Sequence, residues 1–423
     1  MVITDSPDDA GAISSSTAPS AVKPEAPHRM MQLDFLRGIA ILLVICFHGV
    51  VPARSAGVLA PITMHLNRMG WSGVDLFFVL SGFLVGGLLF KECLSTGRLD
   101  VRRFFVRRIF KIWPSYYLFL IYLAVRMHFT SDEERAGTSR SLIPNLLHYQ
   151  NYIVPFRGHT WSLAVEEHFY LILPLLLVFL TSRAKDAEKS LRVFPWIVGA
   201  VAVICLGLRY LTSFHTPWAQ VTHYFPTHLR IDSLFFGAAL AYVYHARPEI
   251  LARVMRYRTL LFFVGLALVF PAALFPIRTK IMSVGGFTAL FLGYGCILLA
   301  VIHTAIGEGP AGRFLGSRLA RGVAFIGVYS YPIYLWHIDA MTLPLKSLAR
   351  HGFLGGLPGS LRWLVFMTVY IAGATLVGVI MGRLVEKPAL KLRDRLFPSR
   401  IDPLVSAGDS RGPHLAPHEV PAA

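Results

Sequence analysis

Two ionisable residues lie in the first long apolar stretch of the chain, residues 33–51, and their spacing suits chemistry inside a membrane. Arg37 and His48 are eleven positions apart. In an α-helix, at about 100° and about 1.5 Å per residue, both project from one face, about 16 Å apart along the axis. Ionisable groups within a span usually face a polar interior or a cavity because lipid does not solvate them. An imidazole exchanges protons near neutral pH, so His48 is suited to be a general base.

A structural interpretation of these two residues stays open. The long side chain of Arg37 can reach the membrane interface, because arginines in spans commonly extend their charged group toward water. His48 can equally be an interior histidine whose ring nitrogens are satisfied by neighbours.

Two adjacent carboxylates, Glu166 and Glu167, open a later apolar stretch over residues 161–181 and are followed by His168. Burying unpaired carboxylates is costly, which favours a functional interpretation over packing. Neighbouring helix positions point about 100° apart, so the two glutamates cannot address one site equally. We expect one to face a cavity and the other to face a partner or the interface.

Counting along the expected helices places four more polar residues at the same depth as His48 and the glutamates. They are Asp75, Arg230, Asp232 and His337. The pattern predicts an acid–base cluster in the outer third of a membrane, reached from an inner basic surface. Ser81 and Gly82 fall near mid-membrane, where Gly82 is expected to allow close helix packing.

A basic segment at the start of the third apolar stretch contains Arg107, Arg108 and Lys111. Such a cluster can bind the phosphates of an anionic cofactor. Cytoplasmic loops are also rich in Lys and Arg without any ligand, so a role in topology explains the cluster equally well.

Composition indicates which elements position these residues. The 423 residues are 54% hydrophobic and only 15% charged, with a mean hydropathy of +0.55. Soluble domains carry about 25% charged residues. Apolar stretches close to the ~20 residues that span a bilayer recur along the chain. We predict an all-α membrane protein, a bundle of about ten transmembrane helices, at residues 33–51, 70–90, 109–127, 161–181, 194–213, 230–246, 259–276, 281–304, 321–341 and 362–384.

The charge distribution predicts the orientation of this bundle. Basic residues concentrate in the even-numbered loops and after the last span, and the net charge is +17. The positive-inside rule then places both termini in the cytoplasm, in a multi-pass protein of the cytoplasmic (inner) membrane. The placement of the basic residues fits membrane lipids and argues against a nucleic-acid partner. Residues 1–32 and 396–423 are expected to be disordered cytoplasmic tails around a domain of residues 33–395.

The four cysteines show no metal-binding spacing, so we expect no metal site. Three of them lie inside apolar stretches and the fourth, Cys93, lies at a basic segment, which also argues against a disulfide framework.

Ordered motifs along residues 31–395 resemble the acyltransferase-3 family of membrane O-acyltransferases. The first apolar stretch is similar to the family's opening motif of a basic residue, ten positions and a histidine. The other matching segments are Gly73 to Leu84, Arg107-Arg108-Ile109 with Pro114 and Tyr117, Trp161-Ser162-Leu163 through Glu166-Glu167 with Phe169-Tyr170, Arg230 and Asp232 with Gly237, Ser330 to His337, and Glu386 with Pro388. His168 departs from the pattern, because the family commonly has Gln there.

The resemblance implies transfer of an acyl group, usually acetyl, from acetyl-CoA or another acyl-CoA to a hydroxyl of a carbohydrate. Acyl-CoA would be a co-substrate, with no tightly bound cofactor. The acceptor is expected to be a surface or lipid-linked glycan, with a secreted small glycoside or macrolide as the second choice.

The same resemblance implies a role for each matched residue. His48, Glu167 and Glu166 would be catalytic, with His48 either activating the acceptor or first taking the acyl group, and a glutamate holding its imidazole. The CoA-binding residues would be Arg37, Arg107, Arg108 and Lys111. The substrate-binding residues would be Asp75, Ser81, Trp161, Arg230, Asp232 and His337. A transporter of glycans or organic anions is the rival hypothesis, and it predicts substrate flux without consumption of CoA.

Overall fold

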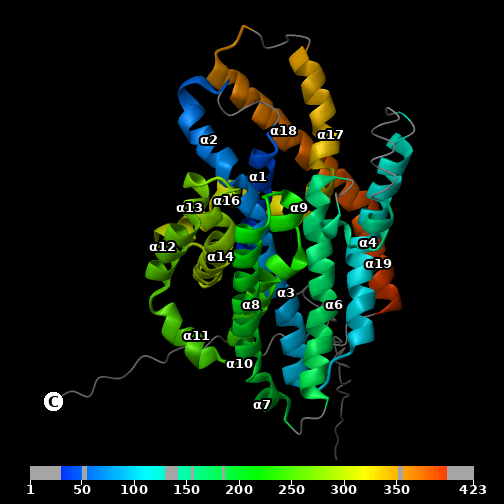
Figure 1. Ribbon diagram of the computed structural model, residues 1–423, viewed down its shortest axis with the longest axis vertical. Coiled ribbons are helices and arrows are strands. Elements are labelled where there is room, and N and C mark those ends of the chain that lie inside the picture. Colours follow the sequence, from blue (N-terminus) through cyan, green and yellow to red (C-terminus); the bar gives the residue numbers. More distant parts are fainter. Residues whose placement is uncertain are drawn as a thin grey trace, which may run out of the picture. The chain divides into compact units, whose positions relative to one another are not determined.

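The computed structural model describes residues 30–49, 55–127, 129, 142–153, 157–182, 186–350 and 356–397. Every regular element within these ranges is helical, which confirms the predicted all-α class (Figure 1). The predicted tails lie outside the described residues, apart from residues 30–32 and 396–397. The first helix begins at Met31, two residues earlier than predicted.

All ten predicted segments contain helix. The main helices are α1 (Met31–Phe47), α3 (Gly73–Thr96), α4 (Val101–Met127), α6 (Trp161–Thr181), α8 (Phe194–His215), α10 (Ile231–Ala246), α12 (Arg258–Val269), α14 (Phe287–Ile302), α16 (Arg318–Val328), α17 (Ser330–Arg350) and α18 (Gly359–Met381). The predicted segment 321–341 is divided between α16 and α17, which are separated at Tyr329.

Shorter helices and turns connect the main ones. The short helices are α2 (Ala60–Met69), α7 (Ala187–Leu191), α9 (Gln220–His223), α11 (Pro248–Met255), α13 (Pro271–Leu274), α15 (Gly309–Leu315) and α19 (Lys387–Leu396). The 3₁₀ turns are η2 (Gly57–Leu59), η3 (Gly70–Ser72), η4 (Gln150–Tyr152), η5 (Gly158–Thr160) and η6 (Thr227–Leu229), and the π-helical turns are η7 (Met282–Gly286) and η8 (Gly382–Glu386).

Five stretches of the described chain are long and apolar enough to cross a membrane, which supports a multi-pass membrane protein. They are Gly57–Thr96, Gly158–Thr181, Ala187–His215, Met282–Ile302 and Gly359–Leu396. A sixth is added if Pro248–Met255 and Arg258–Leu274, bent by 82° relative to each other, form one span. The count of ten stays a prediction, because α1, with 17 residues, and α10, with 16, fall short of the ~20 residues of a straight crossing.

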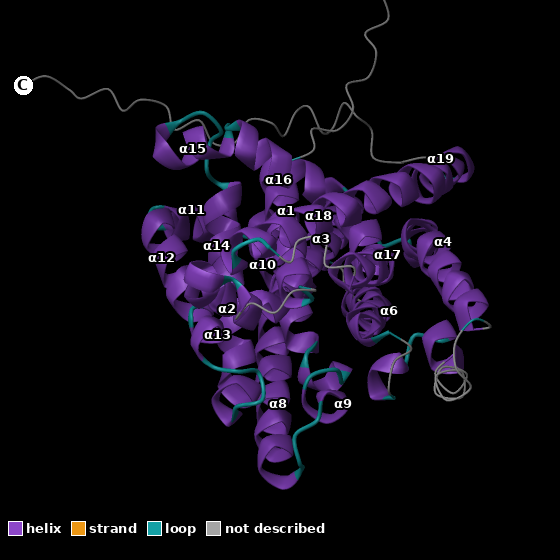
Figure 2. Cartoon of the chain, turned by 90° about the horizontal axis from the view of Figure 1, so that it is seen from above, coloured by secondary structure: helices purple, strands orange, loops and turns teal. Residues whose placement is uncertain are grey.

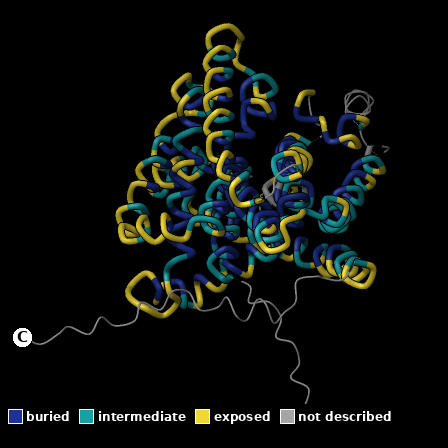
Figure 3. The backbone as a smooth tube through the Cα atoms, turned by 90° about the horizontal axis from the view of Figure 1, so that it is seen from below, coloured by how far each residue is buried: buried dark blue, intermediate teal, exposed yellow. Residues whose placement is uncertain are grey.

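Helix α3 lies at the centre of the bundle and α8 lies at its edge (Figure 2). The apolar window is 72% buried in the stretch that contains α3 and 22% buried in the stretch that contains α8. The exposed residues correspondingly lie mostly on the outer helices (Figure 3). Large apolar side chains such as Trp196 of α8 are largely exposed. In a membrane, lipid would cover them.

Close packing of α3 against α10 depends on glycine, as predicted for Gly82. A Cβ atom at Gly82 would lie 2.0 Å from the backbone oxygen of Leu234, and one at Gly237 would lie 2.3 Å from that of Val79. Small residues let helix backbones approach where no hydrophobic effect drives helices together. This contact holds α3 in the position from which it lines the cavities described next.

Candidate active site

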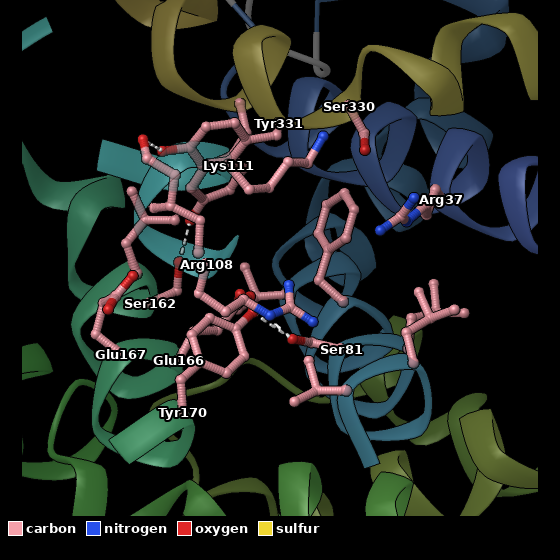
Figure 4. A pocket seen from close by; sticks show the side chains of 18 residues that line it. Arg37, Ser81, Arg108, Lys111, Ser162, Glu166, Glu167, Tyr170, Ser330 and Tyr331 are labelled. Carbon is pink, nitrogen blue, oxygen red and sulfur yellow. Dashed lines mark hydrogen bonds between the residues drawn. The ribbon is translucent and has the colours of Figure 1, made fainter. Parts of the chain in front are cut away.

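Two neighbouring cavities lie between the helices. The first, the basic cavity, contains about 910 Å³ of empty space and is lined by α1, α3, α4, α6 and α17 (Figure 4). Its charged lining residues are Arg37, Arg108, Lys111, Glu166 and Glu167. Together with Ser81, which also lines this cavity, six of the predicted site residues meet here.

A hydrogen-bonded group forms one wall of the basic cavity. The Tyr170 hydroxyl donates to Oε2 of Glu166 at 2.5 Å and lies 2.6 Å from the hydroxyl of Ser81. The Arg108 guanidinium lies 4.9 Å from the centre of the Tyr170 ring, within cation–π range. Charge and hydrogen bonds thus fix Glu166 in place.

The second carboxylate, Glu167, is less completely satisfied. Its Oε1 atom is buried and has no hydrogen-bond partner in the described structure. An acceptor oxygen without a donor at a cavity wall is suited to receive an N–H or O–H group from a ligand.

Lys111 is held at the cavity by an ion pair with Glu386, which lies in the π-helical turn η8. Such turns often mark functional positions in helices. Arg37 lies 3.9 Å from Asp34, one turn earlier in α1. Arg107, by contrast, lies outside both cavities, where it donates to the backbone oxygen of Phe397 and pairs with Asp394 near α19.

The second cavity, the aromatic cavity, contains about 680 Å³ of empty space and includes His48. Its ring-bearing lining residues are Phe47, His48, Trp71, His159, Trp161, Tyr224, Phe225 and Tyr334. Among the residues that the structure describes, this lining includes no Asp, Glu, Lys or Arg. It therefore suits a neutral ligand with apolar faces.

Val74 and Tyr334 line both cavities, so the two spaces adjoin there. The Tyr334 hydroxyl donates to the backbone oxygen of His159 at 2.7 Å and lies 2.6 Å from the hydroxyl of Ser162. The position of the Tyr334 ring between the cavities is thereby fixed.

Predicted spacing and observed geometry agree for the two ends of α1. Arg37 lies on the basic cavity and His48 lies on the aromatic cavity, so this one helix face serves both. The helix ends at Phe47, and the Asn67 side chain donates to the backbone oxygens of Cys46 and Phe47 at 3.0 and 3.1 Å. This cap places His48 just beyond the last turn.

The glutamates do not share a cavity with His48, contrary to the expected single acid–base cluster. In the described structure, neither glutamate lies within hydrogen-bonding distance of His48. The reason is depth: Glu166 is five positions beyond Trp161 on α6, which displaces it about 7.5 Å along the axis. Trp161 lines the aromatic cavity, whereas Glu166 lines the basic one.

Three predicted substrate-binding residues form buried ion pairs and line neither cavity. Nη2 of Arg230 lies 2.5 Å from Oδ1 of Asp75, and Nη2 of Arg209 lies 2.7 Å from Oδ2 of Asp232. All four side chains are almost fully buried. Arg230 also lies 4.8 Å from the ring centre of Tyr224, which lines the aromatic cavity. The buried ion pairs therefore pack against the residues that form the cavity wall.

His337 likewise lines neither cavity and is completely buried. Its Nε2 atom lies 3.4 Å from Nδ1 of His48. The sequence analysis predicted that His337 binds substrate. The structure places it in contact with His48 and outside the lining of both cavities.

Several residues of the site were not singled out from the sequence. Trp71, Tyr224 and Phe225 form much of the aromatic cavity, and Tyr334 lies at its junction with the basic one. Trp71 and Tyr334 fall inside or beside matched motifs, so the motifs carried a signal for them. Tyr224 and Phe225 lie in a loop without a recognisable pattern.

Outside the spans, His148 is a buried histidine with unusual surroundings. It stacks on Tyr116 with ring centres 4.6 Å apart, and neither ring nitrogen has a partner in the described structure. Burial, reinforced by the nearby His168, lowers the pKa of His148 to about 4. The ring is therefore neutral at physiological pH.

Comparison with known proteins gives a consistent result. A family model described as an acyltransferase domain matches residues 31–383. The O-acetyltransferase OatA of Staphylococcus aureus strain NCTC 8325 is 29% identical over 316 residues, which is 68% of this chain and 49% of OatA. A protein of S. aureus strain COL, provisionally named an O-acetyltransferase, is 28% identical over 320 residues, 70% of this chain and 50% of its own length. The chain thus matches about half the length of these relatives. No solved structure matches it.

Proposed function

The chain belongs to the acyltransferase family matched over residues 31–383, and from that premise we propose that it moves an acyl group, with acetyl as the first choice, from acyl-CoA to a hydroxyl of a glycan. One observation supports this most: two cavities of different character adjoin at Val74 and Tyr334, and His48 lines one of them.

The basic cavity is the proposed site for acyl-CoA. Its guanidinium and ammonium groups can pair with phosphates, and Arg can do so through two parallel hydrogen bonds. The unsatisfied Oε1 of Glu167 can accept from an amide N–H of the pantetheine arm. We assign Arg37, Arg108 and Lys111 to the donor, and we leave Arg107 out because its partners lie near α19.

The aromatic cavity is the proposed site for the acceptor. A sugar ring presents apolar C–H faces that pack on aromatic rings, together with hydroxyls that need polar partners. Trp71, Trp161 and Tyr224 supply such faces, and His48 and Gln220 supply polar groups. A surface or lipid-linked glycan is the favoured acceptor, with a secreted small glycoside or macrolide as the second choice.

His48 is the proposed reactive group. In direct transfer, its imidazole takes the proton of the acceptor hydroxyl while the oxygen attacks the thioester carbonyl. The carbon–sulfur bond then breaks, and the thiolate of CoA receives the proton from the imidazolium. In the alternative route, the imidazole attacks the thioester carbonyl, the carbon–sulfur bond breaks and CoA leaves as the thiolate. The acceptor hydroxyl then attacks the acyl-imidazole, the carbon–nitrogen bond breaks, and the hydroxyl proton passes to the thiolate. Both routes require His48 between the thioester and the hydroxyl.

The orientation expected from loop charge fits this assignment. The basic cavity lies toward the start of α1 and the aromatic cavity lies at its end. With both termini in the cytoplasm of an inner-membrane protein, acyl-CoA would enter from the inside and the acceptor from the outside.

The test is transfer of labelled acetyl from acetyl-CoA to a membrane glycan fraction by the purified protein in liposomes. His48→Ala should abolish transfer. His215→Ala, which changes an exposed histidine at the end of α8, should leave transfer intact. Equal transfer by His48→Ala and the unmodified protein would remove the proposed base, and glycan flux without CoA release would favour a transporter. Mass spectrometry of surface polysaccharides from a deletion strain would identify the acceptor.

A further inference from the structure

Three histidines from separate parts of the chain meet at the aromatic cavity. His337 of α17 lies between the other two, with its ring centre 5.1 Å from that of His48 and 5.3 Å from that of His159. His337 and His159 are buried, and His159 and His48 line the cavity. Each ring has at least one nitrogen close to a backbone carbonyl.

Those carbonyls determine where the ring protons lie, because a carbonyl oxygen can only accept. Nδ1 of His48 lies 2.9 Å from the oxygen of Val44, so Nδ1 carries the proton. Nδ1 of His337 lies 2.8 Å from the oxygen of Tyr334, so it carries a proton as well. In the neutral rings, both Nε2 atoms are therefore lone-pair acceptors.

These tautomers define the contact between His48 and His337. The Nε2 lone pair of His337 lies 3.4 Å from the protonated Nδ1 of His48. The Nδ1–H group of His48 is therefore shared between Val44 and His337, with Val44 as the nearer acceptor. The other neutral tautomer of His48, with its proton on Nε2, is disfavoured. It would place the lone pair of Nδ1 against two acceptors, the oxygen of Val44 and Nε2 of His337.

The third histidine has the complementary arrangement. Nε2 of His159 lies 3.2 Å from the oxygen of Leu335, so Nε2 carries the proton. Its Nδ1 atom is buried and has no partner in the described structure. His159 therefore offers no proton to His337 through that nitrogen, and the Nε2 lone pair of His337 remains available to His48.

A buried ion-pair cluster fixes the segments that carry these rings. Asp339 is two residues beyond His337, and Arg157 is two residues before His159. Nη2 of Arg157 lies 2.8 Å from Oδ1 of Asp339, and its Nε atom lies 3.1 Å from both carboxylate oxygens. Arg126 at the end of α4 pairs with the same carboxylate. The relative position of His337 and His159 is thereby held by a bidentate contact.

We infer that His337 is a positioning residue for the reaction: it accepts from Nδ1–H of His48 and so presents Nε2 of His48, without a proton, to the reacting groups. When His48 takes the proton of the acceptor hydroxyl, the positive ring is stabilised through Nδ1–H by Val44 and His337 together. If His48 takes the acyl group instead, the same Nε2 atom forms the bond to the carbonyl carbon while the carbon–sulfur bond breaks and CoA leaves as the thiolate. The inference rests on the proposed function for its catalytic part, whereas the tautomers stand on geometry.

Two matched substitutions separate the two nitrogens of His337. His337→Gln keeps a polar group near the position of Nε2, and His337→Asn keeps one near the position of Nδ1. We expect His337→Gln to retain kcat within a few-fold. We expect His337→Asn to lower kcat about 10- to 100-fold, the range of a lost hydrogen bond to a charged group, with KM for both substrates unchanged. Equal losses in the two variants would overturn the inference.

A second measurement does not depend on activity. In protein labelled with ¹⁵N in histidine rings, the Nδ1 signals of His48 and His337 should show bound protons and their Nε2 signals should not. The His48→Gln and His337→Gln spectra assign the signals by subtraction. A proton on Nε2 of either ring would overturn the inference even in an active enzyme. The predicted tautomers in a protein without transferase activity would instead refute the proposed function alone.

Discussion

Val74 of α3 and Tyr334 of α17 are the two residues shared by the linings of the basic and aromatic cavities. They mark the only place in the described structure where the two linings overlap. In the proposed reaction, with the donor in one cavity and the acceptor in the other, we expect the acyl group to pass beside these side chains. The route can be tested independently of the chemistry.

A larger side chain at position 74 should separate the two cavities. Val74→Phe is expected to lower transfer at least tenfold while acyl-CoA still binds, because the added ring fills the junction and leaves Arg37, Arg108 and Lys111 in place. Overpacking costs about 1–3 kcal/mol of stability, which thermal unfolding will detect. Val74→Ala is the matched control and should keep transfer. A block by Val74→Phe that also removes CoA binding would argue against separate donor and acceptor spaces.

Adjacent arginines on α4 offer a comparison of donor binding. Arg108 lines the basic cavity, and Arg107 pairs near α19. Arg108→Met should raise KM for acyl-CoA about 10- to 100-fold, since a hydrogen bond to a charged group contributes about 1.5–3 kcal/mol. Arg107→Met should leave that KM within about threefold. Initial rates at varied acyl-CoA measure both, and equal effects would mean that the cavity does not hold the phosphates.

The buried ion pair of Arg230 and Asp75 should be essential for stability, and replacing only one of the two residues should destabilise the protein. Arg230→Met or Asp75→Asn is expected to destabilise the protein by about 3–5 kcal/mol, because each leaves a buried charge without its partner. The double variant should lose less than the sum of the two. Thermal unfolding in detergent, measured for the unmodified protein, the two single variants and the double variant, gives the interaction free energy. Strictly additive losses would show that the contact contributes nothing.

Acid should destabilise the protein through His148. Its folded-state pKa, about 4, lies below the ordinary histidine value of about 6.5, so the unfolded chain binds the proton more readily. The neutral ring therefore stabilises the fold fully above pH ~6.5, and that contribution is lost as pH falls toward 4, by up to about 1.4 kcal/mol per unit.

The matching variant is His148→Phe, which keeps a ring against Tyr116 but has no titrating nitrogen. The change in unfolding midpoint between pH 7 and pH 5 should be smaller in this variant. The comparison uses the slope with pH, because position 148 has a φ of 55° and the absolute midpoint also reflects the strain of Phe in that conformation. Parallel slopes would exclude His148 as a source of acid sensitivity.

The helical class and the helix positions followed from the sequence because apolar length and charge placement are local properties. The eleven-residue spacing of Arg37 and His48 also gave the right face of α1, since a helix converts spacing into direction. Gly82 was correctly expected at a helix contact. The break at Tyr329 was not expected, because the apolar pattern continues across it.

Pairing between distant segments was beyond sequence reasoning. Asp75, Arg230 and Asp232 were predicted to bind substrate from their depth and from the family motifs. The sequence does not say that Arg230 pairs with Asp75 and that Arg209 pairs with Asp232. The depth estimate also failed to separate His48 from Glu166. Trp161 and Glu166 are about a turn and a half apart on α6, and that distance is enough to place them in different cavities. The sequence analysis did not predict that Tyr224 and Phe225, which lie in a loop, line the aromatic cavity.

The ion pair between Asp75 and Arg230 also has a consequence for biogenesis. The ribosome makes α3 long before α10, so for 155 residues of synthesis the carboxylate of Asp75 exists without its guanidinium. During that interval the first turn of α3 is better accommodated next to water or the insertion machinery than in lipid. Arrival of α10 then neutralises the charge and brings Gly237 against Val79 in the same event. We therefore expect α3 to reach its final position in the bundle only after α10 has been synthesised.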